Sequence, residues 1–357
     1  MIFSKSRDAS TVILNGLFLD KVGQQSGTYF MSISVIKELL NLDKRYKIIT
    51  TEEFDWAKDR SIKVPKFKKK YRFFFESFYR NIHNNYMWLH FDYFLPYQML
   101  GKTRNNIVVI HDLLPLDIPG AVPFLKKKWF RYQVKRTLSK CESVITISEF
   151  CKKRFEEHFP GLSHNVSVIP NPINTDRFIS SKAVSKELTN MSYFITVAAP
   201  WPHKNLQTVI DAVEDTFQES GIPLYICGTR SKQFVDLKES DSFRFLGFLS
   251  DEELGTAISN AKLMIAPSLY EGFGMTVYEG LALGKFVMAS DLEVYGDLPN
   301  LIKVKNAQSK ESWKVALDSF LANPPTKQPS DISYLRPNVI AEKYNEIIKK
   351  SEIPQSN

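Results

Sequence analysis

The stretch 267-PSLYEGFGMTVYEGLALGKFVMAS-290 combines the local patterns that decide the fold. The four apolar residues before it, 263–266, predict a buried strand, which Pro267 ends. The glycine turn EGFG follows, and an apolar helical pattern begins directly after it. A helix in this position aims its free backbone N–H groups and the positive end of its dipole at one point. The stretch therefore predicts a phosphate site, to which Glu271 and Glu279 add acceptors for hydroxyl groups.

Short apolar strands alternate with helical patterns along the whole chain. In the second half we predict strands at 193–198, 224–228, 243–247 and 285–290, with helices at 206–215 and 253–261. In the first half we predict strands at 11–14, 46–50, 106–110, 143–147 and 166–169, with helices at 31–42, 129–140 and 149–159. Such alternation indicates parallel βαβ units. Because 357 residues exceed one ordinary core, we predict two doubly wound α/β domains with a boundary near 180–190, and a final helix at 339–349.

The composition is that of an ordinary soluble globular protein, with 43% apolar and 24% charged residues. The three cysteines, Cys141, Cys151 and Cys227, are odd in number and have no metal-ligand spacing, which indicates a reducing compartment and disfavours a structural zinc. The first ten residues are too polar for a secretory signal, and no apolar run reaches membrane-spanning length. We therefore expect a cytoplasmic protein that is not an integral membrane protein.

Positive charge is concentrated in the first half of the chain. Residues 1–180 carry 29 Lys and Arg against 17 Asp and Glu, a net charge of +12, and the remainder carries 18 against 22, or −4. Segment 61–83 interleaves seven cations with seven aromatic residues, and 126–131 repeats the pattern. Two interpretations stay open: an interfacial helix on anionic lipid, where each cation contributes about 1 kcal/mol, or a solvated basic loop before a core helix. The cations that carry the membrane interpretation are Lys68, Lys69, Lys70, Arg72 and Lys127.

Further candidates follow predicted strands at their carboxyl ends, where open α/β sheets bind ligands. His111 directly follows the apolar strand at 106–110, and this position favours chemistry over the structural role that is usual for a loop histidine. Gly27 is predicted in a loop, where it either lets the backbone approach an anion or marks a turn. Ser148 is predicted to cap the helix that begins at Glu149.

The opening stretch resembles the donor-binding signature of the retaining family-4 glycosyltransferases, in which a glutamate followed by G-F-G is separated by seven residues from a second glutamate. Further matches to this family follow in the right order: SGTYF at 26–30, VVIHDLLPLDIP at 108–119, ITISEFCKKRF at 145–155, VIPNPINTDRF at 168–178, PHKN at 202–205 and FLGFLSDEEL at 245–254. Each motif alone is weak, but the ordered set is specific. The resemblance covers nearly the whole chain except 54–91 and the last few residues.

This resemblance implies the GT-B fold, in which two Rossmann-like domains face each other across a cleft. We expect an acceptor-side domain at 1–182 and a donor-binding domain at 183–337, with a helix at about 338–352 that packs back on the first domain. The resemblance also implies three catalytic residues: Glu271, which accepts hydrogen bonds from the donor sugar, Lys204, which neutralises the departing diphosphate, and His111, which approaches the sugar from the other domain. Glu279 would hold the ribose hydroxyls.

The other implied donor-binding residues act through their backbone or by leaving space. They are Gly27, Phe248, Leu249, Gly272, Phe273, Gly274, Met275 and Thr276. One arginine that many relatives carry near the PHKN motif is absent here, and His203 and Arg230 are the candidates to replace it. The loop DLEVYGDLPN also departs from the family pattern, and Asp297 is the counterpart that we assign to its carboxylate.

The resemblance implies retaining transfer of a hexose, with mannose favoured, from a nucleotide-diphosphate sugar, with GDP-mannose favoured. The acceptor would be a hydroxyl of a polyprenyl-diphosphate-linked glycan in O-antigen or capsule synthesis, at the inner face of the plasma membrane. A UDP-sugar or dTDP-rhamnose donor is the alternative. Because no D-x-D motif occurs and Lys204 with helix N-termini can stabilise the leaving charge, we expect no metal, and no cofactor beyond the substrate nucleotide sugar.

Two functions of other classes compete with this prediction. A catalytically silent glycosyltransferase-like binding subunit would tolerate Glu271→Gln, which an enzyme would not. A nucleic-acid-binding protein would use the basic aromatic segment and show salt-sensitive binding to oligonucleotides. The complete set of Lys204, His111, Glu271 and Glu279 favours the enzyme, so we expect no nucleic-acid partner. The sequence predicts no oligomeric state.

Overall fold

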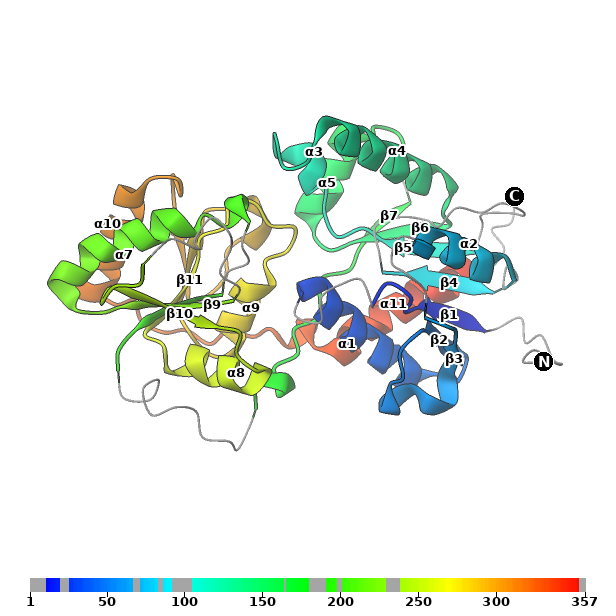
Figure 1. The fold of residues 1–357 in the computed structure, drawn as a ribbon, viewed down its shortest axis with the longest axis horizontal. Helices are drawn as coiled ribbons and strands as arrows, with labels where there is room; N and C mark the ends of the chain where they lie inside the picture. Colours follow the sequence, from blue (N-terminus) through cyan, green and yellow to red (C-terminus); the bar gives the residue numbers. More distant parts are fainter. Residues whose placement is uncertain are drawn as a thin grey trace. The chain divides into compact units, whose positions relative to one another are not determined.

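The computed structural model describes residues 11–19, 26–66, 71–82, 86–91, 105–163, 165–179, 191–197, 201–228 and 238–352. The chain forms two compact units (Figure 1). Unit 1 comprises Met1–Pro172 and Tyr334–Asn357, and unit 2 comprises Ile173–Ser333. The boundary that the sequence predicts at 180–190 lies outside the described residues. The end of the chain belongs to unit 1.

Unit 1 is built on a seven-stranded sheet with the strand order β3-β2-β1-β4-β5-β6-β7, and its neighbouring strands are all parallel. The strands are β1 (Val12–Asn15), β2 (Tyr46–Thr50), β3 (Ser61–Lys63), β4 (Met87–His90), β5 (Asn106–Val109), β6 (Ser143–Thr146) and β7 (Val166–Val168). The strand order reverses between β1 and β4. That reversal is the topological switch point of a doubly wound sheet.

The helices of unit 1 cover this sheet. They are α1 (Gly27–Leu42), α2 (Arg72–Ile82), α3 (Leu114–Asp117), α4 (Phe124–Lys140), α5 (Glu149–His158) and α11 (Pro337–Glu352), with the 3-10 helix η1 (Asp55–Arg60). Helix α11 packs against α1, and a buried hydrogen bond joins it to the sheet: the Tyr46 hydroxyl donates to Asn345 Oδ1 at 2.7 Å. The last helix therefore completes the unit in which the chain begins.

Two helix starts show how local chemistry sets the boundaries. Ser148 caps α5, as predicted, because its side-chain oxygen accepts a hydrogen bond from Cys151 N–H at 3.1 Å. Ser26 caps α1 in the same way by accepting from Tyr29 N–H at 3.2 Å. This cap makes Gly27 the first residue of the helix, so the prediction that Gly27 lies in a loop is wrong. Gly27 is exposed at the helix N-terminus.

Unit 2 repeats the same design with a six-stranded parallel sheet in the order β10-β9-β8-β11-β12-β13. The strands are β8 (Phe194–Val197), β9 (Leu224–Cys227), β10 (Phe243–Gly247), β11 (Leu263–Ala266), β12 (Val287–Ser290) and β13 (Leu301–Val304). Most are buried on both faces, as parallel strands covered by helices are. The switch point of this sheet lies between β8 and β11.

The helices of unit 2 form two apolar layers with this sheet. They are α7 (Leu206–Ser220), α8 (Asp251–Asn260), α9 (Met275–Ala282) and α10 (Lys310–Ala322), with the 3-10 helices η3 (Asp176–Phe178), η4 (Pro202–Lys204) and η6 (Glu293–Tyr295). One core cluster joins the sheet to α7 and α10 around the buried Trp313, and the other joins it to α8 and α9 around Met264. Helices thus cover both faces of the sheet, and the carboxyl ends of β8 and β11 lead into loops.

Candidate functional site

A small cavity lies at the carboxyl ends of β8 and β11, which is the switch point of the unit 2 sheet. Its lining comes from the ends of both strands, from η4, from the turn after β11, from the start of α9 and from η6. The lining residues are Thr196, Val197, Lys204, Ala266, Pro267, Ser268, Glu271, Gly274, Thr276, Val277 and Tyr295. Doubly wound sheets bind their ligands at this position. The structure therefore brings Lys204 together with Glu271, Gly274 and Thr276, as the sequence predicts.

Lys204 and Glu271 form an ion pair in this cavity. Lys204 Nζ lies 2.6 Å from Glu271 Oε1, and the two side chains are 24% and 19% exposed. Lys204 is the last residue of η4, and the loop after β11 is fixed against η4 because Leu269 N–H donates to the His203 carbonyl at 2.7 Å. The pair gives the cavity one cation and one hydrogen-bond acceptor. A phosphate that entered would compete with Glu271 for the Lys204 ammonium.

The N-terminus of α9 provides the second anion-binding feature of the cavity. Gly274, which precedes the helix, has a left-handed backbone with φ +87°. Val277 N–H donates to the Gly274 carbonyl, but within the described part of the chain no acceptor is seen for the N–H groups of Met275 and Thr276. Free N–H groups at a helix start favour a phosphate or carboxylate. The start of α9 therefore offers two backbone N–H donors, and the phosphate site stays a prediction.

Two lining residues were not predicted from the sequence. Thr196 is completely buried at the end of β8, and among the residues that the structure describes its Oγ1 has no hydrogen-bond partner. Tyr295 is buried beside Gly274, where a Cβ would overlap its ring. Burial, and then the nearby Glu271, raise the pKa of the Tyr295 hydroxyl well above its usual value of 10.0, so this group stays a neutral donor. A threonine at a strand end and an aromatic residue in the loop after β12 were the only sequence signals for them.

The Glu279 carboxylate is held by an arginine that the sequence analysis did not single out. Arg177 Nη2 donates to Glu279 Oε1 at 2.7 Å, and Arg177 Nη1 donates to Asp251 Oδ1 at 2.7 Å. Burial raises the pKa of Glu279 above its usual value, and the charge of Arg177 opposes that rise. Glu279 lies on the apolar helix α9, and a carboxylate in that setting was the signal that a cation partner was needed.

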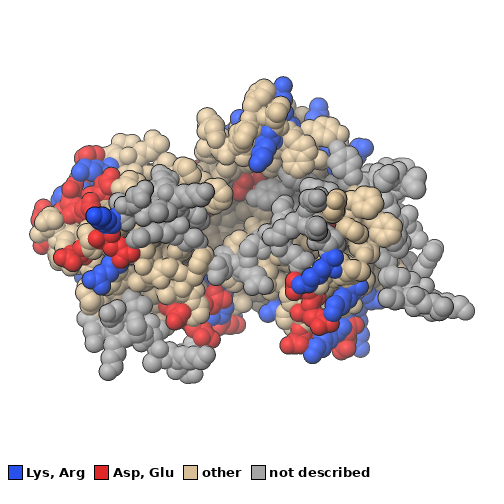
Figure 2. Space-filling view, in the orientation of Figure 1, with Lys and Arg blue, Asp and Glu red and all other residues tan. Residues whose placement is uncertain are grey.

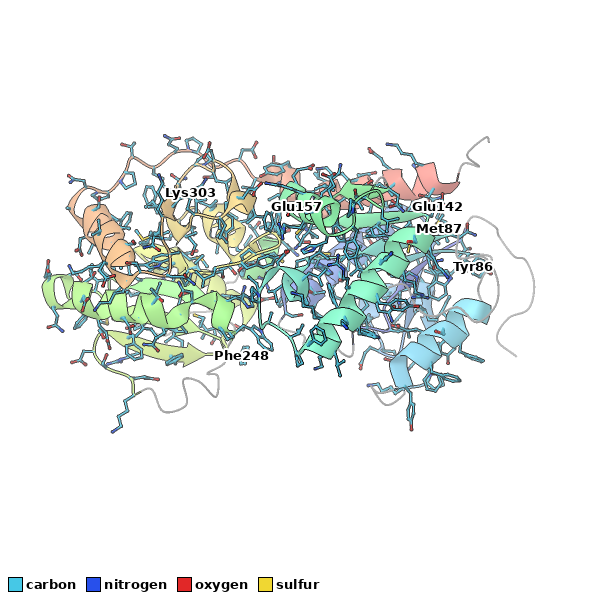
Figure 3. The ribbon with its side chains drawn as sticks, turned by 90° about the horizontal axis from the view of Figure 1, so that it is seen from above. Tyr86, Met87, Glu142, Glu157, Phe248 and Lys303 are labelled. Atoms are coloured by element: carbon cyan, nitrogen blue, oxygen red, sulfur yellow. The ribbon has the colours of Figure 1, made fainter. Side chains whose placement is uncertain are left out.

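The remaining predicted residues of unit 2 differ in where they lie. Phe273 is buried and stacks on Tyr278 with ring centroids 4.5 Å apart, and Gly272 is buried beside it. Phe248 follows strand β10 and is 55% exposed (Figure 3). Leu249 packs against the core cluster of α8 and α9. Neither Phe248 nor Leu249 lines the cavity. Their contact with a nucleobase stays a prediction.

The candidates for the missing phosphate cation differ in what the structure shows. Burial, followed by the charge of Lys204, lowers the pKa of His203 below 6.5, so the free protein holds this ring neutral at pH 7. Arg230 lies outside the described residues. Asp297 is fully exposed and pairs at 3.4 Å with Lys303, which is labelled in Figure 3, and Asp297 does not line the cavity. Tyr295, two residues earlier, is the residue by which this loop reaches the cavity.

In unit 1, His111 follows β5 and is buried. The His111 ring Nε2 lies 3.0 Å from the Phe91 carbonyl oxygen, which accepts a hydrogen bond from the ring N–H. This bond sets the tautomer of the neutral ring, with hydrogen on Nε2. Of the cations predicted to contact a membrane, Lys68, Lys69 and Lys70 lie outside the described residues. Arg72 begins α2, and Lys127 Nζ donates to the Leu116 carbonyl at 3.1 Å.

Two properties of the described residues bear on metals and membranes. Within the described ranges, no group of three or more His, Cys, Asp and Glu side chains has the arrangement of a metal site. No helix in that part of the chain is both long enough and apolar enough to span a bilayer.

Two family models match the chain, "Glycosyltransferase Family 4" over residues 37–177 and "Glycosyl transferases group 1" over residues 179–334. O-antigen chain mannosyltransferase RfbU of Salmonella typhimurium is 31% identical over 224 residues, which are 61% of each chain. O-antigen chain mannosyltransferase B of Escherichia coli is 22% identical over 225 residues, 58% of each chain. The matched region thus spans about three fifths of these relatives.

The fold is also similar to that of a solved glycosyltransferase structure. WaaG, a glycosyltransferase involved in lipopolysaccharide biosynthesis, superimposes with a TM-score of 0.65 over 96% of each chain at 13% identity. This likeness concerns the fold alone. The chain therefore belongs to the family-4 glycosyltransferases and has their GT-B fold of two parallel-sheet α/β domains. Both predictions made from the sequence are confirmed.

Proposed function

We propose that this protein transfers a hexose, with mannose favoured, from a nucleotide-diphosphate sugar to a hydroxyl of a glycan acceptor. The observation that carries the proposal is the switch-point cavity of unit 2, where Lys204, Glu271 and the N-terminus of α9 meet. The Lys204 cation and the free backbone amides of α9 suit a diphosphate, and the Glu271 carboxylate suits sugar hydroxyls. The names of the Salmonella and Escherichia relatives favour mannose, and with it GDP-mannose over a UDP-sugar or dTDP-rhamnose.

In the proposed reaction, the bond between the anomeric carbon and the diphosphate oxygen breaks, and the electron pair leaves with the diphosphate. The acceptor hydroxyl attacks on the same face, and its proton passes to the departing phosphate oxygen, so configuration is retained. Lys204 and the α9 amides stabilise the growing negative charge. Because Lys204 would exchange Glu271 for the diphosphate, the released carboxylate would become free to accept from the sugar hydroxyls.

We propose that no metal takes part, because the Lys204 ammonium and the α9 N-terminus supply positive charge where a metal would. The measurement is the initial transfer rate in EDTA and after addition of Mg²⁺ or Mn²⁺. We expect the same rate in all three conditions. Loss in EDTA with recovery in either ion would contradict this part of the proposal.

Retention is tested by the configuration of the product. Proton NMR of the product should show the same anomeric configuration as the donor sugar. An inverted product would exclude the same-face mechanism.

His111 is proposed to act on the donor sugar during this step. We expect His111→Ala to lower kcat about 10- to 100-fold while the nucleotide dissociation constant stays unchanged.

A lipid-linked acceptor at the inner membrane face is proposed from two exposed surfaces of unit 1. On α2, Phe74 and Phe78 are 63% and 49% exposed and lie one turn apart, whereas Glu76 and Ser77 on the other side are buried. A helix that turns aromatic rings outward suits an interface between water and lipid. The basic residues that precede this helix in the sequence supply the charge for anionic lipid.

The second surface is the exposed face of α4. Leu125, Trp129 and Tyr132 are 78%, 45% and 55% exposed, and their spacing places them on one side of the helix. Lys126 and Lys128 are exposed beside them. Figure 2 shows Lys and Arg among uncharged side chains over this part of unit 1. We call these five residues the α4 face and propose that it contacts anionic lipid.

Vesicle flotation tests the membrane proposal. Wild-type protein should float with vesicles of phosphatidylglycerol and phosphatidylcholine and not with phosphatidylcholine alone. Lys126→Glu with Lys128→Glu should reduce flotation, and Lys68, Lys69 and Lys70 changed to Gln should do the same. The control is Lys310→Glu with Lys314→Glu on α10 of unit 2. If flotation is the same in every unit 1 variant as in the wild-type protein, the membrane proposal is overturned.

The donor is tested by thermal shift with GDP, UDP, dTDP and ADP and their sugar conjugates. A ligand at tenfold its dissociation constant stabilises the fold by about 1.4 kcal/mol. We expect GDP and GDP-mannose to raise Tm most. The donor that binds should then label lipid-linked material in membranes. If no nucleotide raises Tm and no sugar is transferred, the proposed function is wrong.

A further inference from the structure

Arg177 connects the segment that enters unit 2 with two helices of that unit. Unit 2 begins at Ile173, and Arg177 stands in η3 shortly after it. Its guanidinium lies between Asp251, at the start of α8, and Glu279, in the middle of α9, with both nitrogen-to-oxygen distances at 2.7 Å. The arginine side chain is only 14% exposed. It is therefore a shielded bridge between two carboxylates that are distant in the sequence.

The packing around η3 fixes the position of this arginine. The Arg177 guanidinium carbon lies 4.2 Å from the centroid of the Phe178 ring, and Phe178 is buried. Helix α8 approaches so closely that a Cβ on Gly255 would overlap the Phe178 backbone and Cβ. The Asp251 end is fixed as well, because Ser250 and Glu253 form a capping box at the start of α8. The guanidinium is therefore held by its own element and by α8.

Glu279 depends on this bridge more than Asp251 does. The Glu279 side chain is 10% exposed, against 36% for Asp251. An unpaired carboxylate at such a site loses solvation and takes up a proton. Arg177 occupies Oε1, and among the described residues the structure shows no donor to Oε2. Glu279 therefore keeps an acceptor oxygen whose direction is set by the ion pair on the other oxygen.

We infer that Arg177 is a positioning residue of the nucleotide site, which orients Glu279 as the acceptor for the ribose hydroxyls of the donor. This inference rests on the proposed function and on the role predicted there for Glu279. Arg177 itself touches no substrate in this assignment. Its effect should be confined to the ribose contact and should disappear when Glu279 no longer carries a charge.

The test compares GDP and UDP with their 2′,3′-dideoxy analogues by calorimetry. Hydrogen bonds from two hydroxyls to a charged acceptor favour the ribonucleotide by about 10-fold or more in wild-type protein. In Arg177→Gln we expect this preference to fall to about threefold or less, with little change for the dideoxy analogue. Arg177→Lys should restore part of it, and the preference in Arg177→Gln should recover as pH rises, because Glu279 must then ionise without its cation.

Two further variants separate positioning from a structural role. Asp251→Asn breaks the other half of the bridge and should lower Tm while the ribose preference remains. In Glu279→Gln, adding Arg177→Gln should cause no further loss of preference. The inference is overturned if the Arg177 variants weaken binding of the ribonucleotide and of its dideoxy analogue equally, or if they lower Tm while the ribose preference stays. In either case the proposed function stands. If wild-type protein binds neither nucleotide, the proposed function fails, and this inference fails with it.

Discussion

The two units share one strand order but treat their switch points differently. In unit 1, Asn15 and His90 are register partners at the ends of β1 and β4, and Asn15 Nδ2 donates to His90 Nδ1 at 3.0 Å. His90 Nε2 lies 3.1 Å from Asn106 Oδ1, and all three side chains are buried. In unit 2, the corresponding strand ends border a cavity with a charged pair and the Thr196 hydroxyl, which lacks a partner among the described residues.

This difference shows that topology places a site but does not supply its chemistry. The neutral network of unit 1 satisfies its own polar groups and so stabilises the sheet. The unit 2 switch point keeps groups that a ligand can satisfy better than the protein does. Changes at the unit 2 point should therefore affect catalysis, whereas changes at the unit 1 point should affect stability.

The largest effect is expected from the charged pair. Glu271→Gln and Lys204→Met should each lower the initial rate of sugar transfer about 100- to 1,000-fold, because in the proposed reaction each removes a group that acts on developing charge or on the donor sugar. The measurement is incorporation of labelled sugar into lipid-linked material. Lys303→Gln removes an exposed ion pair of the same unit and is the control. If Glu271→Gln keeps turnover within threefold of the wild-type value, a catalytically silent binding subunit would be favoured instead.

Next is the glycine that opens α9. Gly274→Ala introduces a side chain at φ +87° and against the Tyr295 ring, so it should destabilise the protein by about 2–4 kcal/mol and abolish nucleotide binding. Gly221→Ala is the matched control, because Gly221 is also left-handed, with φ +65°, but no atom lies near the added Cβ. Thermal unfolding and GDP calorimetry measure both effects. Equal losses in the two variants would show that backbone strain, and not the shape of the cavity, is responsible.

Patterns within a few residues were enough to predict most of the fold. The strand, turn and helix at β11 and α9 have the predicted order, and the Ser148 cap is confirmed. Strands β3, β4 and β13 were missed, and helix α10 was missed with β13. Strand β3 has a single apolar residue and β4 has no β-branched residue, so neither shows the pattern by which other strands of the same length were predicted. Helix α4 begins at Phe124, five positions before the expected start, although its first turn exposes Phe124 and Leu125.

The site was predictable only where one motif contained it. Lys204 and Glu271 each belong to a recognisable motif, and the structure joins them across 67 positions. The partnership of Arg177 with Glu279 spans 102 positions, and a single sequence does not show which cation pairs with Glu279. Tyr295 was missed because its role depends on the space that Gly274 leaves, which is a property of the packed structure.

The unit 1 network gives the third test. His90→Ala should leave Asn15 and Asn106 with buried groups unpaired, at a cost of about 1–3 kcal/mol for each group. Urea unfolding should show this loss, while the GDP dissociation constant stays within twofold of the wild-type value. Thr196→Val is the mirror experiment in unit 2, where stability should hold and GDP affinity should fall. A His90 variant that lost GDP binding at full stability would remove the distinction between the two switch points.

The smallest effect concerns His203, whose pKa lies below 6.5 because of burial and then the charge of Lys204. A depressed histidine pKa means that the unfolded chain binds the proton more readily than the fold does. The stabilising contribution of the neutral ring is thus complete above pH 6.5 and is lost as pH falls through the lower, folded value. His203→Gln should therefore be less sensitive to acid than wild-type protein when Tm is measured from pH 7.5 to 5.

If His203 replaces the absent arginine, nucleotide binding should have the opposite pH dependence and become stronger as pH falls. A bound diphosphate favours the imidazolium, so GDP affinity of the wild-type protein should rise about two- to fivefold as pH falls below 6.5, the gain of a partly exposed charge pair. His203→Gln should remove this rise and leave affinity at pH 7.5 unchanged. An identical pH profile in the variant would assign the phosphate charge to Lys204 and the α9 amides alone, which would make the unit 2 switch point a site with a single cation.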